Sequence, residues 1–89
     1  MNSTNKFIFL PRFKKNYKKL SEISKEKVNQ ALIKMERGLT HPSLGVKKIK
    51  GTKNIWEARA SRSLRITFNF EGDTIILRTV GEHDVLSHP

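Results

Sequence analysis

The chain has 89 residues, enough for a single domain over residues 1–89 and too few for two. Its 18 Lys and Arg residues against 8 Asp and Glu residues give a net charge of +10, which predicts nucleic acid, the ribosome, an anionic membrane or an acidic protein as partner. The chain has no cysteine, which excludes a disulfide scaffold, a thiolate metal site and a cysteine nucleophile, and fits a cytoplasmic protein.

The first elements predicted are a short strand and a basic helix. Residues 6–10 are predicted to form a short strand rich in β-branched and aromatic residues. The apolar run within it, Phe7-Ile8-Phe9-Leu10, is too short for a signal peptide or a membrane span, so we expect no membrane partner. Pro11 suits the first turn of a helix. Phe13, Tyr17 and Leu20 then recur at helical spacing among lysines, which predicts an amphipathic helix.

A second helix follows a break at residues 21–23. Ser24 is the predicted N-cap, and Ile23 is expected to pack against Val28 as a hydrophobic staple. Gly38 stands where a C-cap glycine belongs. Helical spacing also predicts one apolar stripe, formed by Val28, Ala31, Leu32, Met35 and Leu39. The two helices are therefore expected to form an antiparallel hairpin with one side against a sheet.

Residues 40–53 have no regular pattern and carry the densest local charge. Four lysines fall within seven positions, at Lys47, Lys48, Lys50 and Lys53. They either protect a solvated loop or edge strand against aggregation, or form a rim that binds phosphate beside the following strands. The sequence leaves both alternatives open.

Three short strands follow, over residues 55–60, 64–70 and 74–80, joined by short turns. The predicted fold is α+β with the order β-α-α-β-β-β: a small antiparallel sheet with a two-helix hairpin packed on one face. Each strand carries one arginine out of step with its apolar residues, namely Arg59, Arg65 and Arg78. Because the helices occupy one face, we expect the arginines on the other, as a surface for phosphate.

Acid and base groups lie in the same segment. Glu57 shares the side-chain parity of Arg59, so it is either a general base or one half of a cross-strand ion pair. His83 follows the last strand and is either an acid or base, since histidine titrates near neutrality, or a surface residue. Asp84 either orients His83 through a hydrogen bond or caps a turn. His83, Asp84 and His88 lack the spacing of a standard metal site, and the glycines form no phosphate-binding loop, so we expect no metal and no cofactor.

Five phrases in this order resemble the RelE/ParE superfamily, the toxins of toxin–antitoxin pairs. They are His41-Pro42-Ser43-Leu44, Lys47-Lys48-Ile49-Lys50-Gly51, Trp56-Glu57-Ala58-Arg59-Ala60, Leu64-Arg65-Ile66 and Val80-Gly81-Glu82-His83-Asp84. The resemblance covers nearly the whole chain. It implies an antitoxin as protein partner, and for the RelE-like branch it implies cleavage of mRNA on the ribosome.

Metal-free cleavage of RNA needs a base for the 2′-hydroxyl, cations for the scissile phosphate and an acid for the leaving oxygen. Arginine suits the second task because its planar fork binds phosphate bidentately. By resemblance, Arg59 and Arg65 hold the phosphate, and Glu57 or His83 moves protons with Asp84 orienting His83. The cationic surface is extended by Lys47, Lys48, Lys50 and Arg78.

The chain departs from the family in one place. RelE-like nucleases often carry an aromatic residue near the C-terminal catalytic position, whereas this chain continues Val85-Leu86-Ser87-His88-Pro89. Two alternatives to the nuclease therefore stay open: a ParE-like inhibitor of DNA gyrase, and a non-catalytic RNA-binding member of the fold.

Overall fold

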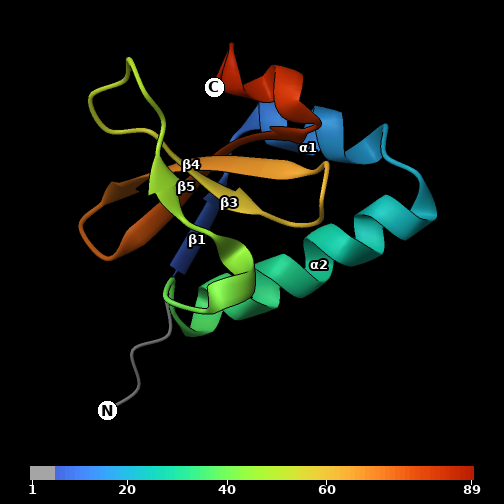
Figure 1. Ribbon diagram of the computed structural model, residues 1–89, viewed down its shortest axis with the longest axis horizontal. Helices are drawn as coiled ribbons and strands as arrows, with labels where there is room; N and C mark the ends of the chain where they lie inside the picture. The colour runs from blue at the N-terminus through green and yellow to red at the C-terminus, as the bar shows by residue number, and fades with distance from the viewer. Residues whose placement is uncertain (1–5) are drawn as a thin grey trace.

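The computed structural model describes residues 6–89, which form a five-stranded sheet with two α-helices and two short 3-10 helices (Figure 1). In chain order the elements are β1 (Lys6–Phe9), α1 (Pro11–Lys18), α2 (Glu22–Arg37), η1 (Pro42–Leu44), β2 (Lys47–Lys48), β3 (Trp56–Arg59), β4 (Arg65–Glu71), β5 (Thr74–Gly81) and η2 (His83–Leu86). The predicted α+β class is confirmed, and so is the order β-α-α-β-β-β, to which the structure adds the two-residue strand β2. Within residues 6–89, no helix has the length and apolar character needed to cross a membrane.

The sheet is mixed, and this corrects the expectation of a wholly antiparallel one. The strand order is β1-β5-β4-β3-β2. Strands β2 to β5 pair antiparallel, as the short turns between the last three predict, whereas β1 runs parallel to β5 with Phe7 opposite Ile75. Parallel neighbours need a long connection rather than a hairpin. The chain supplies one here, because both helices and three strands separate β1 from its partner.

The lysine-rich segment forms an edge strand. In β2, Lys47 lies opposite Glu57 and Lys48 lies opposite Trp56 of β3. Both lysine side chains are exposed. A short edge strand of two lysines is poorly suited to pairing with another sheet. The first alternative for this segment, an edge strand that lysines protect against aggregation, is therefore present, and phosphate binding by the same lysines stays a prediction.

The helix boundaries differ from the predicted ones at the start of α2. Its N-cap is Ser21, whose Oγ accepts a hydrogen bond of 3.1 Å from the amide of Ser24. The Ser24 cap is therefore wrong, because the hydroxyl three residues earlier already satisfies that amide. The staple is absent as well, since Ile23 is 72% exposed. At the other end, the Gly38 cap is confirmed, with φ of 157° and its amide bonded to the Lys34 carbonyl.

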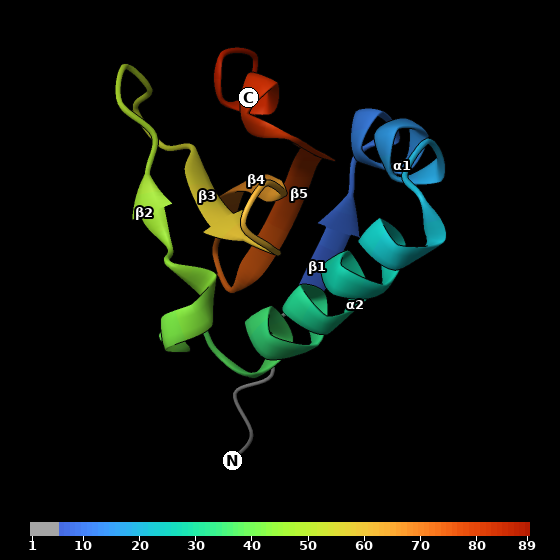
Figure 2. The ribbon, with the colours of Figure 1, turned by 45° about the vertical axis from the view of Figure 1, so that its right-hand side comes forward.

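The hydrophobic core lies between α2 and one face of the sheet, which we call the core face (Figure 2). From α2 the buried stripe consists of Val28, Ala31 and Met35, which meets the sheet residues Ala58, Ile66, Phe68, Leu77 and Val80. Full burial of a large apolar side chain contributes roughly 1.5–3 kcal/mol, so this stripe fixes which side of α2 faces the sheet. Helix α1 packs beside β5, inserts Phe13 into the same core, and bonds Asn16 Nδ2 to Thr79 Oγ1 at 2.7 Å.

Candidate functional site

The opposite face of the sheet, which we call the outer face, is covered by the C-terminal segment. Glu57, Arg65 and Thr67 point to this face because they alternate with the core residues of β3 and β4. Helix η2 packs against β4 and β5, and its Val85 is buried. The contact at Gly81 is close: a Cβ there would lie 2.7 Å from Val85 Cγ1. The outer face is therefore covered, where the sequence alone predicted an open surface.

Hydrogen bonds hold the last residues of the chain on this face. Thr67 Oγ1 donates to the Pro89 carbonyl at 3.2 Å, and Arg78 Nε donates to the same oxygen at 3.0 Å. Arg12 of α1 bonds to the His88 carbonyl. These contacts place Arg78 beneath the C-terminal segment. Sequence reasoning missed Thr67, because a threonine in a strand looks like an ordinary β-former.

A β-bulge interrupts the pairing of β4 and β5 beside Arg78, which lies on the outer face because it alternates with the core residue Leu77. The pairing between β4 and β5 shifts at Thr67 and Phe68, so that Arg78 has no partner of its own between Leu77 and Thr79. An extra residue of this kind redirects the side chains that follow it. Arg78 Nη1 also donates to Asn69 Oδ1 at 3.1 Å, so most of its contacts are with neighbouring chain segments.

Arg65 and Glu57 form a buried ion pair. The Arg65 Nε and Glu57 Oε1 atoms are 3.5 Å apart, and the side chains are only 9% and 10% exposed. Arg65 Nη1 also donates to the carbonyl oxygens of Ser61, Arg62 and Leu64 at 3.0–3.1 Å. The ion-pair alternative for Glu57 is thus present in the structure, and Arg65 closes the turn between β3 and β4. A role of either residue in catalysis stays a prediction.

A groove on the outer face brings the predicted lysines to Glu57. Its wall is formed by Lys47, Lys48, Ile49 and Lys50 on one side and Leu86 on the other, and Glu57 lies between them. The groove encloses about 410 Å³, and we call it the basic groove. Its three lysines are exposed and have no ion-pair partner within residues 6–89. The arrangement offers cations for a phosphate chain next to one carboxylate.

Arg59 is separate from the other two predicted arginines. It is exposed at the end of β3, opposite Arg65, and has no hydrogen bond or ion pair in the part of the chain that the structure describes. Its guanidinium lies against Gly45, where a Cβ would be 4.0 Å from Cζ. The three arginines therefore have three environments: Arg59 is free, Arg65 is paired and Arg78 is covered.

His83 and Asp84 begin η2, and both are exposed. No hydrogen bond or ion pair joins these two described residues, so the proposed orienting contact is not formed here. Asp84 instead lines a hollow together with Asn16 of α1 and Lys19, the C-cap residue of that helix. Across residues 6–89, no group of three or more His, Cys, Asp or Glu side chains is placed to hold a metal ion.

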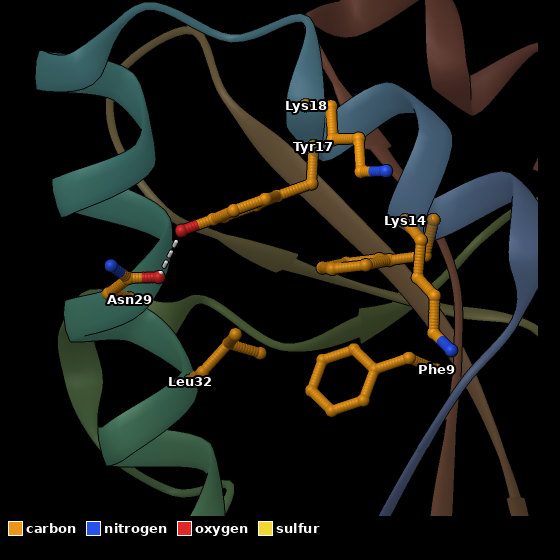
Figure 3. Close-up of a pocket in the computed structure, with 7 residues that line it drawn as sticks. Phe9, Lys14, Tyr17, Lys18, Asn29 and Leu32 are labelled. Carbon is orange, nitrogen blue, oxygen red and sulfur yellow. Dashed lines mark hydrogen bonds between the residues drawn. The ribbon is translucent and has the colours of Figure 1, made fainter.

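A second groove of similar size has a different character. It encloses about 440 Å³ between α1 and α2, and it is lined by Phe9, Phe13, Lys14, Tyr17, Lys18, Asn29 and Leu32 (Figure 3). Figure 3 shows the aromatic rings and Leu32 facing one another, and the Tyr17 hydroxyl bonded to Asn29 Oδ1 at 2.7 Å. The groove is apolar apart from its lysines and holds no carboxylate or histidine, so it lacks the acid and base that RNA cleavage needs.

No protein-family model matches the sequence, and no curated protein matches it. Solved structures do. A chain of the RelB–RelE antitoxin–toxin complex from Methanococcus jannaschii aligns with a TM-score of 0.74 and 26% identity, over 90% of this chain and 94% of that one. HP0894 from Helicobacter pylori aligns with a TM-score of 0.70 and 20% identity, over 90% of this chain and 96% of that one. YoeB from Staphylococcus aureus aligns with a TM-score of 0.68 and 17% identity, over 90% of this chain and 98% of that one. With this fold and this likeness, the chain belongs to the RelE/ParE toxin superfamily.

Proposed function

We propose that the protein is the toxin of a toxin–antitoxin pair, and that it inhibits translation in the cytoplasm by cleaving mRNA on the ribosome. The likeness to a chain of the RelB–RelE antitoxin–toxin complex supports the toxin role. The basic groove is the observation that carries the nuclease activity, because it joins three exposed lysines to a carboxylate. A gyrase inhibitor would need no acid or base in such a position.

The chemistry that we propose uses groups of this chain and no metal ion. Lys47, Lys48 and Lys50 bind the RNA backbone along the groove. The Glu57 carboxylate takes the proton of a 2′-hydroxyl, and the 2′-oxygen forms a bond to the adjacent phosphorus. The bond to the 5′-oxygen breaks, and His83 gives that oxygen a proton. Arg59 has a guanidinium free to stabilise the charge on the phosphate.

This route requires the C-terminal segment to move. Glu57 is 7% exposed and Leu86 forms the wall beside it. A 2′-hydroxyl can reach the carboxylate only if that wall opens. The segment is held by a few hydrogen bonds to Pro89 and His88 and by the packing of Val85. Such a locally held segment opens at a lower free energy than the core does.

The antitoxin is expected to be acidic and to cover the basic groove. Structures with this fold include two toxin–antitoxin complexes, RelB–RelE and DinJ–YafQ. The net charge of +10 favours a partner of opposite sign. Binding over Lys47, Lys48 and Lys50 would block access of mRNA to the same side chains.

The test is to express the wild type and Glu57→Gln in a bacterial host and map mRNA 5′ ends. We expect growth arrest with new mRNA ends inside coding sequences for the wild type. Loss of the base should lower cleavage by a factor of 10²–10⁴. Growth arrest without new ends would contradict the nuclease, and inhibition of supercoiling by purified gyrase would then support the alternative. Folding of Glu57→Gln is checked by circular dichroism, because the substitution leaves Arg65 without its counter-charge.

A further inference from the structure

A second cationic pocket lies at the other end of β3, between α2 and the turn from β3 to β4. We call it the α2 pocket. It encloses about 250 Å³. Its polar lining consists of Glu26, Lys27, Gln30, Lys34, Ser43, Arg59 and Ser61. Apart from Arg59, and Ser43 in one of the phrases of the family resemblance, none of these residues was named from the sequence, because lysines on an exposed helix look like an ordinary solvated face.

The cations of the α2 pocket are available to a ligand. Arg59 and Lys27 are exposed and have no hydrogen bond or ion pair within the described residues 6–89. Lys34 Nζ donates only to the Ser43 hydroxyl at 3.0 Å, and that hydroxyl lies 2.9 Å from His41 Nδ1. The chain of contacts holds Lys34 in place without neutralising it. Three positive charges therefore converge on one hollow with no protein carboxylate bonded to them.

The single acid of the pocket does not cancel this charge. Glu26 is exposed, and its Oε2 accepts a hydrogen bond of 3.0 Å from Gln30 on the same helix. Ser61 Oγ accepts from the Leu64 amide, which leaves its own proton free to be donated. The pocket thus combines a net charge of about +2 with a hydroxyl donor, a set that suits the oxygens of a phosphate group.

The position of Arg59 links the two cationic regions. Glu57, in the basic groove, and Arg59, in the α2 pocket, are two residues apart on β3, which separates their Cα atoms by about 7 Å. The Arg59 guanidinium lies against Gly45, where a Cβ would be 4.0 Å from Cζ, and Arg59 lines the α2 pocket. The two cationic regions therefore each take one residue from the same short stretch of β3.

We propose that Lys27, Lys34 and Ser61 of the α2 pocket bind a backbone phosphate of the same RNA next to the scissile phosphate, which Arg59 contacts at the border of the pocket. This inference rests on the proposed function, since it takes RNA as the ligand. The pocket is then a binding subsite that adds affinity and sets the direction of the strand, and it contributes no proton transfer.

The test measures binding of a fluorescent single-stranded RNA whose 2′-hydroxyls are methylated, so that it cannot be cleaved. Fluorescence anisotropy is recorded between 50 and 300 mM salt for the wild type, Lys27→Ala/Lys34→Ala and a control, Lys6→Ala/Lys15→Ala. The control removes two exposed lysines from β1 and α1, outside both cationic regions. Loss of one phosphate contact should reduce the slope of log K against log salt by about 0.7 for the pocket variant alone.

Equal slopes for the pocket variant and the control would overturn the proposal, as would a wild type that does not bind this RNA. If the pocket variant has the wild-type slope of log K against log salt for RNA but binds the co-purified acidic partner more weakly, the pocket binds protein and the proposal is overturned. Failure of the nuclease is distinguishable, because the methylated RNA reports binding only. If the pocket variant changes the salt slope but the wild type produces no new mRNA ends in cells, RNA binding by the α2 pocket is supported and mRNA cleavage is contradicted.

Discussion

The two faces of the sheet are buried to a similar degree but by different chemistry. On the core face, Ala58, Ile66 and Phe68 are fully buried against α2 by apolar packing. On the outer face, Thr67 is also fully buried and the Glu57–Arg65 pair nearly so, under the C-terminal segment. Apolar packing over a whole helix holds one face closed, whereas an ion pair, a few hydrogen bonds and one valine close the other. The outer face is therefore the one expected to open for a ligand.

The largest expected effect is on the core face. Phe68→Ala removes a fully buried ring and should lower the free energy of unfolding by about 3–5 kcal/mol. Urea denaturation followed by circular dichroism measures this change. A loss below about 1 kcal/mol would show that α2 does not seal the core face in the way described.

The next effect concerns the ion pair of the outer face. Arg65→Met leaves the Glu57 carboxylate buried without a partner and should lower the free energy of unfolding by about 3 kcal/mol. Adding Glu57→Gln should restore part of the loss. The double-mutant cycle in urea denaturation checks the coupling. Strictly additive losses would mean that the two side chains do not interact across the 3.5 Å separation.

A smaller effect is expected where η2 leaves β5. Gly81→Ala places a methyl group 2.7 Å from Val85 Cγ1, and the crowding should lower the free energy of unfolding by about 1–3 kcal/mol. Val85→Ala in the same chain removes the opposing atom and should relieve part of that loss. If Gly81→Ala is as stable as the wild type, the C-terminal segment does not pack on the sheet as closely as the structure shows.

The smallest effect tests the hydrogen bond to the last residue. Thr67→Val keeps the shape of the side chain but removes the donor to the Pro89 carbonyl, at a loss of about 0.5–1.5 kcal/mol. Hydrogen exchange should show faster exchange at the Ser87 and His88 amides, which bond within η2, and unchanged exchange in β4. Faster exchange across the whole of β4 would contradict a local opening of the outer face.

Sequence periodicity sufficed for the parts of the fold that depend on neighbouring residues. The stripe of α2, the meander of β3 to β5 and the cap at Gly38 follow from local spacing and turn chemistry. The parallel pairing of β1 with β5 could not be predicted in this way, because it joins segments almost seventy residues apart. The bulge at Arg78 was missed for a related reason: it depends on the register between two strands and not on the pattern of either one.

The candidate site was predictable in its residues but not in their environments. Parity placed Glu57 on the same face as Arg59, and a cross-strand ion pair was one of the two alternatives that the sequence left open for it; the structure shows that pair with Arg65 as the partner. Nothing in the sequence showed that Val85 would pack against Gly81 and so cover the outer face. The lysines of the α2 pocket were equally hidden, since their convergence with Arg59 depends on how α2 lies against the end of β3.

The most direct test of the central claim, that the outer face binds and cleaves RNA, is a map of mRNA 5′ ends in cells that express Lys48→Ala/Lys50→Ala. The Lys6→Ala/Lys15→Ala variant is the matched control, with the same loss of charge outside the basic groove. We expect the groove variant to lose most of the new ends and the control to keep them. Equal numbers of new ends in both variants would contradict the account.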